Sequence, residues 1–118
     1  MKATKISIDT EGNGLESILK PYQAEAMKLL WEGGDYSSRE VWEIINQRIT
    51  SRDSISRASV INFLNAMVED GVLDYVETTG KGGYRRIYTA SKTEQKFWVW
   101  LIQVVNEKLK EASGLHNW

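Results

Sequence analysis

The sequence predicts an α+β fold that is mainly helical, with three helices, a β-hairpin and a longer final helix in that order. Three observations predict it. Apolar residues recur at helical spacing within residues 21–72 and again after residue 93. A Ser-x-x-Glu capping box stands before two of these helical stretches. A glycine-rich turn separates two short runs of strand-favouring residues within 73–89.

The composition fits one domain and excludes several classes of site. The chain has 118 residues, 42% of them hydrophobic, which is enough for a buried core. It has no cysteine and a single histidine, His116, so disulfides and thiolate metal sites are excluded. We find no phosphate-binding glycine loop and no nucleophile–base pair, and expect no enzyme, metal or cofactor. We also find no membrane-spanning run and no signal-peptide pattern, which favours a soluble cytoplasmic protein.

The first part of the chain divides into an extension and a helix. Residues 1–19 are weakly patterned, with Ile6 and Ile8 alternating with polar neighbours, so we expect an N-terminal extension, either a short strand or a disordered lead, ahead of a domain that begins at residue 20. Pro21 opens the helix, because the first helical position does not need a backbone N–H. The Gly33-Gly34 pair ends this helix, and Asp35-Tyr36 could add a brief strand.

The second helix is predicted from a capping box and an aliphatic stripe. Ser37 and Glu40 have the spacing at which each side chain accepts a hydrogen bond from the other's backbone N–H. The short polar turn at 50–53 joins this helix to the next at a steep angle, as in a helix-turn-helix unit. Its buried stripe is expected to be Val41, Ile44, Ile45 and Ile49.

The third helix is expected within residues 54–72, capped by Ser54 or Ser56 and stopped by Gly71. Its apolar face comprises Val60, Phe63, Leu64, Met67 and Val68. The opposite face is basic or hydrogen-bonding and has no acid before Glu69, which is typical of a helix that lies in the major groove of DNA. That face comprises Arg57, Ala58, Ile61, Asn62 and Asn65.

A hairpin follows, with strands at 73–78 and 84–89 and a glycine-rich turn at 79–83. Three helices followed by such a hairpin form a winged helix-turn-helix, which we expect to span residues 20–90.

The formal net charge of −1 counts against a nucleic-acid partner, but the charges are unevenly distributed. Residues 37–57 hold four arginines against three acids, and residues 81–90 hold three bases and no acid. Residues 58–80 between them hold four acids and no base. The positive charge therefore lies just before the third helix and in the hairpin.

The last helix is expected at 91–113, opened by a capping box of Ser91 and Glu94, with a tail at 114–118. It is apolar around its whole circumference near its start, and such a helix must be buried on both sides. One side can cover the domain, for which the candidates are Leu101, Ile102, Val105 and Leu109. We expect a second copy of the chain to cover the other side, with a homodimer interface drawn from Phe97, Trp98, Trp100, Leu101, Val104 and Val105.

This order of elements resembles the penicillinase-repressor and methicillin-repressor family of winged-helix regulators. The likeness is carried by residues 21–31, 56–65 and 86–89. In the family's recognition-helix pattern, Ser56, Val60 and Leu64 match the family's residues, whereas Ser59 and Asn62 stand where the family has threonine. Ala66 replaces the arginine of that pattern, and the family's longer dimerisation region has no counterpart here. Phenolic-acid and multiple-antibiotic-resistance type regulators share the same winged core.

The resemblance implies a sequence-specific double-stranded DNA-binding transcriptional regulator, a repressor by the family's example. We expect residues 55–70 in the major groove and the wing at 79–86 on the backbone or in the minor groove. The expected phosphate contacts are Arg39, Arg52, Ser56, Ser59, Lys81, Arg85 and Arg86. The expected base readers are Arg57 for guanine and Asn62 or Asn65 for adenine, while Ile61 could touch thymine methyls or turn inward.

A second interpretation is a winged-helix module that binds protein and not DNA. The acidic run from residue 69 to residue 77 and the net charge of −1 favour it.

Overall fold

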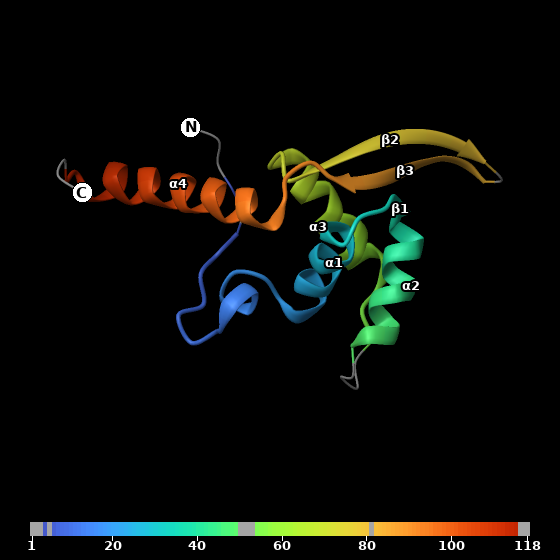
Figure 1. Ribbon diagram of the computed structural model, residues 1–118, viewed down its shortest axis with the longest axis horizontal. Coiled ribbons are helices and arrows are strands. Elements are labelled where there is room, and N and C mark those ends of the chain that lie inside the picture. The colour runs from blue at the N-terminus through green and yellow to red at the C-terminus, as the bar shows by residue number, and fades with distance from the viewer. Residues whose placement is uncertain (1–3, 5, 50–53, 81, 116–118) are drawn as a thin grey trace.

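The computed structural model of the chain describes residues 4, 6–49, 54–80 and 82–115 (Figure 1). It is α+β, with a small antiparallel sheet beside a cluster of helices, and this confirms the predicted class and order of elements. In chain order the elements are η1 (Gly14–Ser17), α1 (Pro21–Trp31), β1 (Tyr36–Ser37), α2 (Ser38–Arg48), α3 (Arg57–Glu69), β2 (Leu73–Gly80), β3 (Gly83–Ala90) and α4 (Glu94–Ser113).

The first two long helices begin where the sequence predicts. Pro21 is the first residue of α1. The capping box before α2 is confirmed, because the Ser37 hydroxyl accepts from the Glu40 backbone N–H at 3.2 Å and Glu40 accepts from the Ser37 N–H at 3.0 Å. Ser37 is buried and also belongs to β1, so the cap joins α2 directly to the sheet.

The third helix is capped by Ser56, whose hydroxyl accepts from the Ser59 N–H at 3.1 Å. It ends before Gly71, which has a φ of 78° and occupies the left-handed conformation that glycine tolerates. A bond of 2.9 Å from the Val72 N–H to the Met67 carbonyl closes the end of the helix. Both predicted boundaries are therefore confirmed, and Ser56 is the capping residue of the two candidates.

The segment that leads into α3 is held by α2. The Trp42 indole N–H donates to the Ile55 carbonyl at 2.6 Å, and the Asn46 side-chain oxygen accepts from the Ile55 N–H at 3.1 Å. These bonds tie both backbone groups of Ile55 to one face of α2 and so fix the position from which α3 starts.

The sheet has the strand order β1-β3-β2. Strands β2 and β3 form a hairpin that pairs Leu73 with Ala90 at one end and Gly80 with Gly83 at the other. Both strands are longer than predicted, because the ladder extends to Gly80 and Gly83 at one end and to Ala90 at the other. The hairpin projects well beyond the helices (Figure 1).

The core lies between α1, α2, α3, the base of the hairpin and the first turns of α4. The Trp31 ring lies 5.4 Å from that of Phe97, and its indole N–H donates to the Lys92 carbonyl at 3.1 Å. The start of α4 is therefore anchored on α1. Beyond that anchor α4 leaves the body as an arm (Figure 1), and the molecule measures 55 × 32 × 23 Å.

The predicted cap of α4 is wrong. The helix begins at Glu94, and the capping hydroxyl is that of Thr93, which accepts from the Lys96 N–H at 3.2 Å. Ser91 instead donates to the Gly71 carbonyl at 2.7 Å. It therefore joins the turn after α3 to the segment before α4.

Candidate nucleic-acid interface

The two sides of α3 differ as the sequence predicts. Val60, Phe63, Leu64 and Met67 are buried, and Val68 is half-buried. On the opposite side Arg57, Ala58 and Asn62 are exposed, whereas Ile61 and Asn65 are half-buried at its edge. The exposed side thus has one basic and several hydrogen-bonding groups over its first two turns.

Asn65 is joined to the hairpin. Its side-chain oxygen accepts from the Arg86 guanidinium at 3.1 Å and from the Tyr88 hydroxyl at 2.7 Å. The guanidinium carbon also lies 4.0 Å from the centre of the Tyr75 ring, a cation–π contact. Burial raises the pKa of the Tyr88 hydroxyl, and the positive charge of Arg86 partly opposes that rise. Arg86, expected as a phosphate contact, is therefore already engaged in joining β3 to α3.

The two neighbouring arginines of β3 lie on opposite faces of the hairpin, because side chains alternate along a strand. Arg86 shares the face of Tyr88 and Tyr75, which is turned toward α3. Arg85 pairs with Thr78 in the ladder, and its side chain lies on the other face of the hairpin, where it is exposed. The two expected phosphate contacts on β3 therefore point to opposite sides of the hairpin.

The other expected cations differ in how they are engaged. Arg39, on α2, forms an exposed ion pair of 3.1 Å with Glu43, and such a pair is weak enough to exchange for a phosphate. Arg57 is exposed at the start of α3, and we find no ion pair for it among the described residues. Arg52 and Lys81 lie outside the described residues.

The two serines at the start of α3 are engaged with each other. Besides the capping bond, their hydroxyl oxygens lie 2.9 Å apart. Ser56 is exposed and Ser59 is half-buried. Both lie at the helix N-terminus, where backbone N–H groups favour an anion.

The N-terminal extension packs beside α3, which the weak pattern of its residues did not predict. The Thr4 hydroxyl donates to the Asp70 carboxylate at 2.7 Å, and Ile6 and Ile18 pack against the core. A hollow of about 700 Å³ lies between the extension and α3. Its lining includes Ser59, Asn62, Phe63 and Met67 from α3, and Asp9 and Glu16 from the extension.

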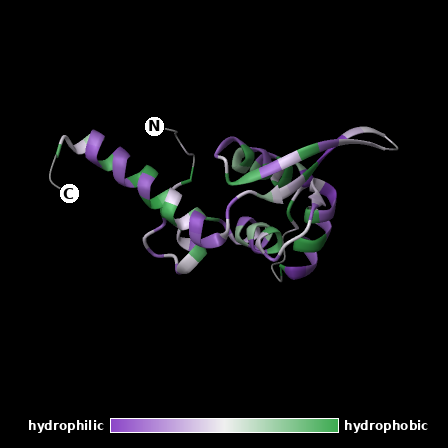
Figure 2. Ribbon diagram, turned by 45° about the horizontal axis from the view of Figure 1, so that its top comes forward, coloured by the Kyte–Doolittle hydropathy of each residue, from purple (hydrophilic) through white to green (hydrophobic). Residues whose placement is uncertain are grey.

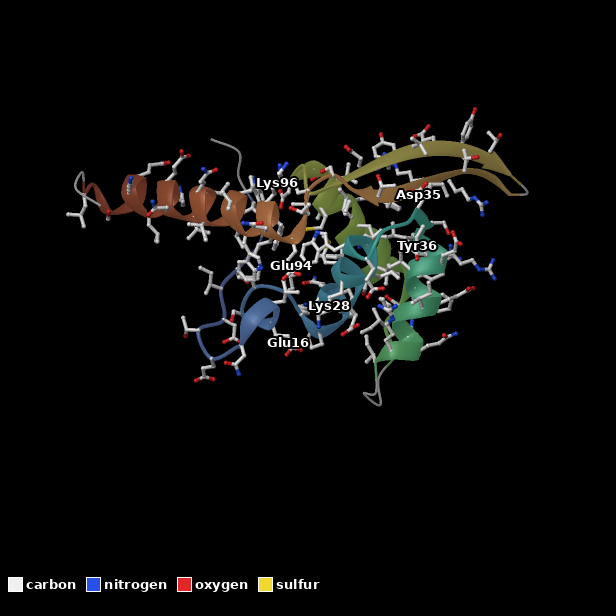
Figure 3. The ribbon with its side chains drawn as sticks, in the orientation of Figure 1. Glu16, Lys28, Asp35, Tyr36, Glu94 and Lys96 are labelled. Atoms are coloured by element: carbon white, nitrogen blue, oxygen red, sulfur yellow. The ribbon has the colours of Figure 1, made fainter. Side chains whose placement is uncertain are left out.

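The two acids of this hollow matter for any anionic partner. Both are exposed, and Glu16 projects from η1 (Figure 3). Phosphate near Ser59 or Asn62 would feel their repulsion, which weakens as salt rises. Asn65, which faces the hairpin, is not part of the lining of this hollow.

The structure exposes a different set of α4 residues from the one predicted for the dimer interface. Phe97 is 0% exposed inside the chain's own core, so it cannot contact a second copy. Leu101 is 3% exposed and also packs in this core, but it lines the apolar groove described below. Ile102 and Leu109, expected to cover the domain, are 62% and 49% exposed, because α4 leaves the body after its first turns.

The remaining predicted interface residues on α4, Trp98, Trp100, Val104 and Val105, are half-buried. Trp100 packs on Phe97 with ring centres 6.0 Å apart. Trp98, Ile102, Val105 and Leu109 instead line an apolar groove of about 380 Å³, together with Ile8 and Ile18 of the extension. Figure 2 shows apolar residues recurring along α4 beyond the body.

A scan against models of known protein families and a search of curated proteins both found no match. The likeness to winged-helix repressors therefore remains a prediction from the residues. In the part of the chain that the structure describes, no helix is both long and apolar enough to cross a membrane.

Proposed function

We propose that this chain is a winged-helix regulator that binds double-stranded DNA sequence-specifically as a homodimer. The observation that carries the proposal is the union of α3 and the hairpin: an exposed helix face without acids over its first turns, bonded through Asn65 to a projecting hairpin. A helix and a wing held in one orientation can enter the groove and touch the backbone together.

The dimensions suit this mode of binding. Helix α3 has 13 residues and is about 20 Å long, and the major groove, about 12 Å wide, admits a helix. In this docking Arg57 and Asn62 meet base edges, while Ser56 and the helix N-terminus meet a phosphate. Arg39 contributes from α2 after exchange of its ion pair, and Arg85 contributes from the outer face of the wing.

The arm provides the proposed homodimer contact. The groove residues Trp98, Ile102, Val105 and Leu109 have spacings of four, three and four, which is the period of a helix–helix seam. The same stripe on a second copy is complementary to it in an isologous two-fold pair. Such a pair would place two α3 helices on half-sites about one helical turn of DNA apart.

A second candidate is a module that binds another protein through α3 and the wing. The acids Asp9 and Glu16 beside α3, and the net charge of −1, favour this alternative. A basic protein surface would be attracted where DNA phosphate is repelled.

Fluorescence anisotropy with a random-sequence duplex pool, titrated between about 50 and 200 mM salt, separates the two candidates. We expect binding whose log affinity falls with log salt, with a slope that loses about 2 units per dimer in Arg39→Ala. Lys108→Ala is the matched control, because it removes the same charge from the far part of α4. No binding by the unmodified chain at the lowest salt would overturn the proposal and make the protein-binding module the leading function.

A further inference from the structure

The orientation of the Asn65 amide is set by its partners. A guanidinium has donors only, so the atom of Asn65 that accepts from Arg86 must be the oxygen and not the nitrogen. The Tyr88 hydroxyl donates to the same oxygen at 2.7 Å. An amide oxygen has two lone pairs, and these two bonds occupy both of them.

Several contacts keep Arg86 in this position. Glu77 lies directly opposite Arg86 in the hairpin ladder and would be the ordinary ion-pair partner. Among the described residues no such pair forms, and the guanidinium lies over the Tyr75 ring and bonds to Asn65. Tyr88 is 2% exposed, so its hydroxyl is held by the surrounding core. The Asn65 oxygen is therefore held in place from the hairpin side by two well-positioned donors.

What remains on Asn65 for a partner is the amide nitrogen with its two hydrogens. Adenine offers an acceptor and a donor side by side in the major groove, and an asparagine pairs with both only when its own oxygen is available. With that oxygen occupied, the adenine amino group would be left without an acceptor, which costs free energy. A base edge that presents a keto acceptor, as guanine and thymine do, suits the nitrogen alone.

We infer that Asn65 is a specificity-determining residue that selects a keto base, guanine or thymine, because Arg86 and Tyr88 of the wing occupy its oxygen. Adenine reading is then left to Asn62, which is exposed and has no such contact with the hairpin among the described residues. This inference rests on the proposed DNA-binding function, and it corrects the expectation that Asn65 itself suits adenine.

The test is selection of bound duplexes from a random pool, followed by sequencing, with the full chain and its variants. The base pair that Asn65 contacts is identified as the position whose base preference is lost in Asn65→Ala. At that position the unmodified chain should select guanine or thymine, and the sequenced duplexes show which of the two. In Tyr88→Phe combined with Arg86→Met the oxygen is released, and adenine should gain at least about fivefold at that position. Adding Asn65→Ala to this pair should abolish the gain.

Adenine at that position in the unmodified chain would overturn the inference, and so would the absence of any position that responds to Asn65→Ala. A measurement without DNA guards against a variant that fails to fold. In the free protein the ¹³C shift of the Asn65 carboxamide should change in Tyr88→Phe, which removes a single oxygen atom. An unchanged shift would show that the oxygen is not occupied as described. Failure of the unmodified chain to bind any duplex would instead refute the proposed function.

Discussion

Replacing Ile102 by glutamate should separate the proposed dimer into monomers while leaving the fold of each copy intact. Ile102 lies in the middle of the apolar groove of α4 and is 62% exposed in the single chain. Its side chain therefore contributes little to the core of one copy. In the proposed pair it would be covered by the stripe of the other copy.

The expected effect can be worked from this exposure. Complete burial of an isoleucine side chain is worth about 1.5–3 kcal/mol, so covering the exposed 62% gives about 1–2 kcal/mol per copy. Two-fold symmetry doubles this to about 2–4 kcal/mol, which corresponds to a rise of roughly 30- to 700-fold in the dimer dissociation constant. The glutamate adds the cost of placing a charge in an apolar seam, so the dimer should be lost at micromolar concentration.

Sedimentation equilibrium or light scattering after size-exclusion chromatography measures the change. Gln103→Glu is the matched control, because it adds the same charge at an exposed position away from the groove residues. The control should remain dimeric, and both variants should keep the helix content of the unmodified chain by circular dichroism, because Ile102 contributes little to the core of one copy. A dimer that persists unchanged in Ile102→Glu would refute the assignment of the groove as the seam. A monomeric unmodified chain would refute the homodimer itself.

Four other predictions follow from single side chains. Arg57→Ala should weaken binding to a selected site by about tenfold or more, and binding to random sequence much less; equal losses in competition assays would assign Arg57 to phosphate. Glu16→Gln should raise duplex affinity at low salt and have no effect at high salt, whereas a gain that persists at high salt would rule out charge repulsion. Trp42→Phe removes the indole bond to Ile55 and should cost about 1 kcal/mol, or about 4 °C in melting temperature by calorimetry; an unchanged melting temperature would contradict it. Because the pKa of Tyr88 is raised in the folded chain, its proton stabilises the native state fully below about pH 10 and less as the pH rises through the folded pKa. Tyr88→Phe should therefore flatten the loss of stability at alkaline pH that urea unfolding measures. An equally steep loss in the variant would contradict this.

The features predicted well from the sequence are those set by near neighbours. The start of α2 depends on Ser37 and Glu40, three residues apart, and the end of α3 depends on Gly71 adopting a positive φ. The prediction of the α4 cap was wrong because a contact between distant residues decides it. Ser91 has the right spacing for a cap, but its hydroxyl is bonded to a carbonyl 20 residues away, and the nearer Thr93 caps the helix.

The candidate site was predicted in outline but not in its contacts. Composition and helical period suffice to find the exposed face of α3. They do not reveal that Asn65 is bonded to residues 21 and 23 positions further along the chain. Nor do they reveal that the weakly patterned extension packs beside that face, because its few apolar residues, among them Ile6 and Ile18, carry no period. The sequence also does not reveal where α4 leaves the body, which exposes Ile102 and Leu109.

The charges around α3 make the arm necessary to the proposed function. One copy offers few described cations to the backbone, since Arg86 is bonded to Asn65 and the carboxylates of Asp9 and Glu16 lie beside the helix. A single copy would therefore bind weakly, because few phosphate contacts contribute to its affinity. Joining two copies makes the second half-site contact intramolecular, and the effective concentration then supplies affinity that the charges do not. It follows that Ile102→Glu should abolish sequence-specific binding although Ile102 touches no DNA in the proposed docking. Retention of full specific affinity by that monomer would show that one α3 and its wing suffice.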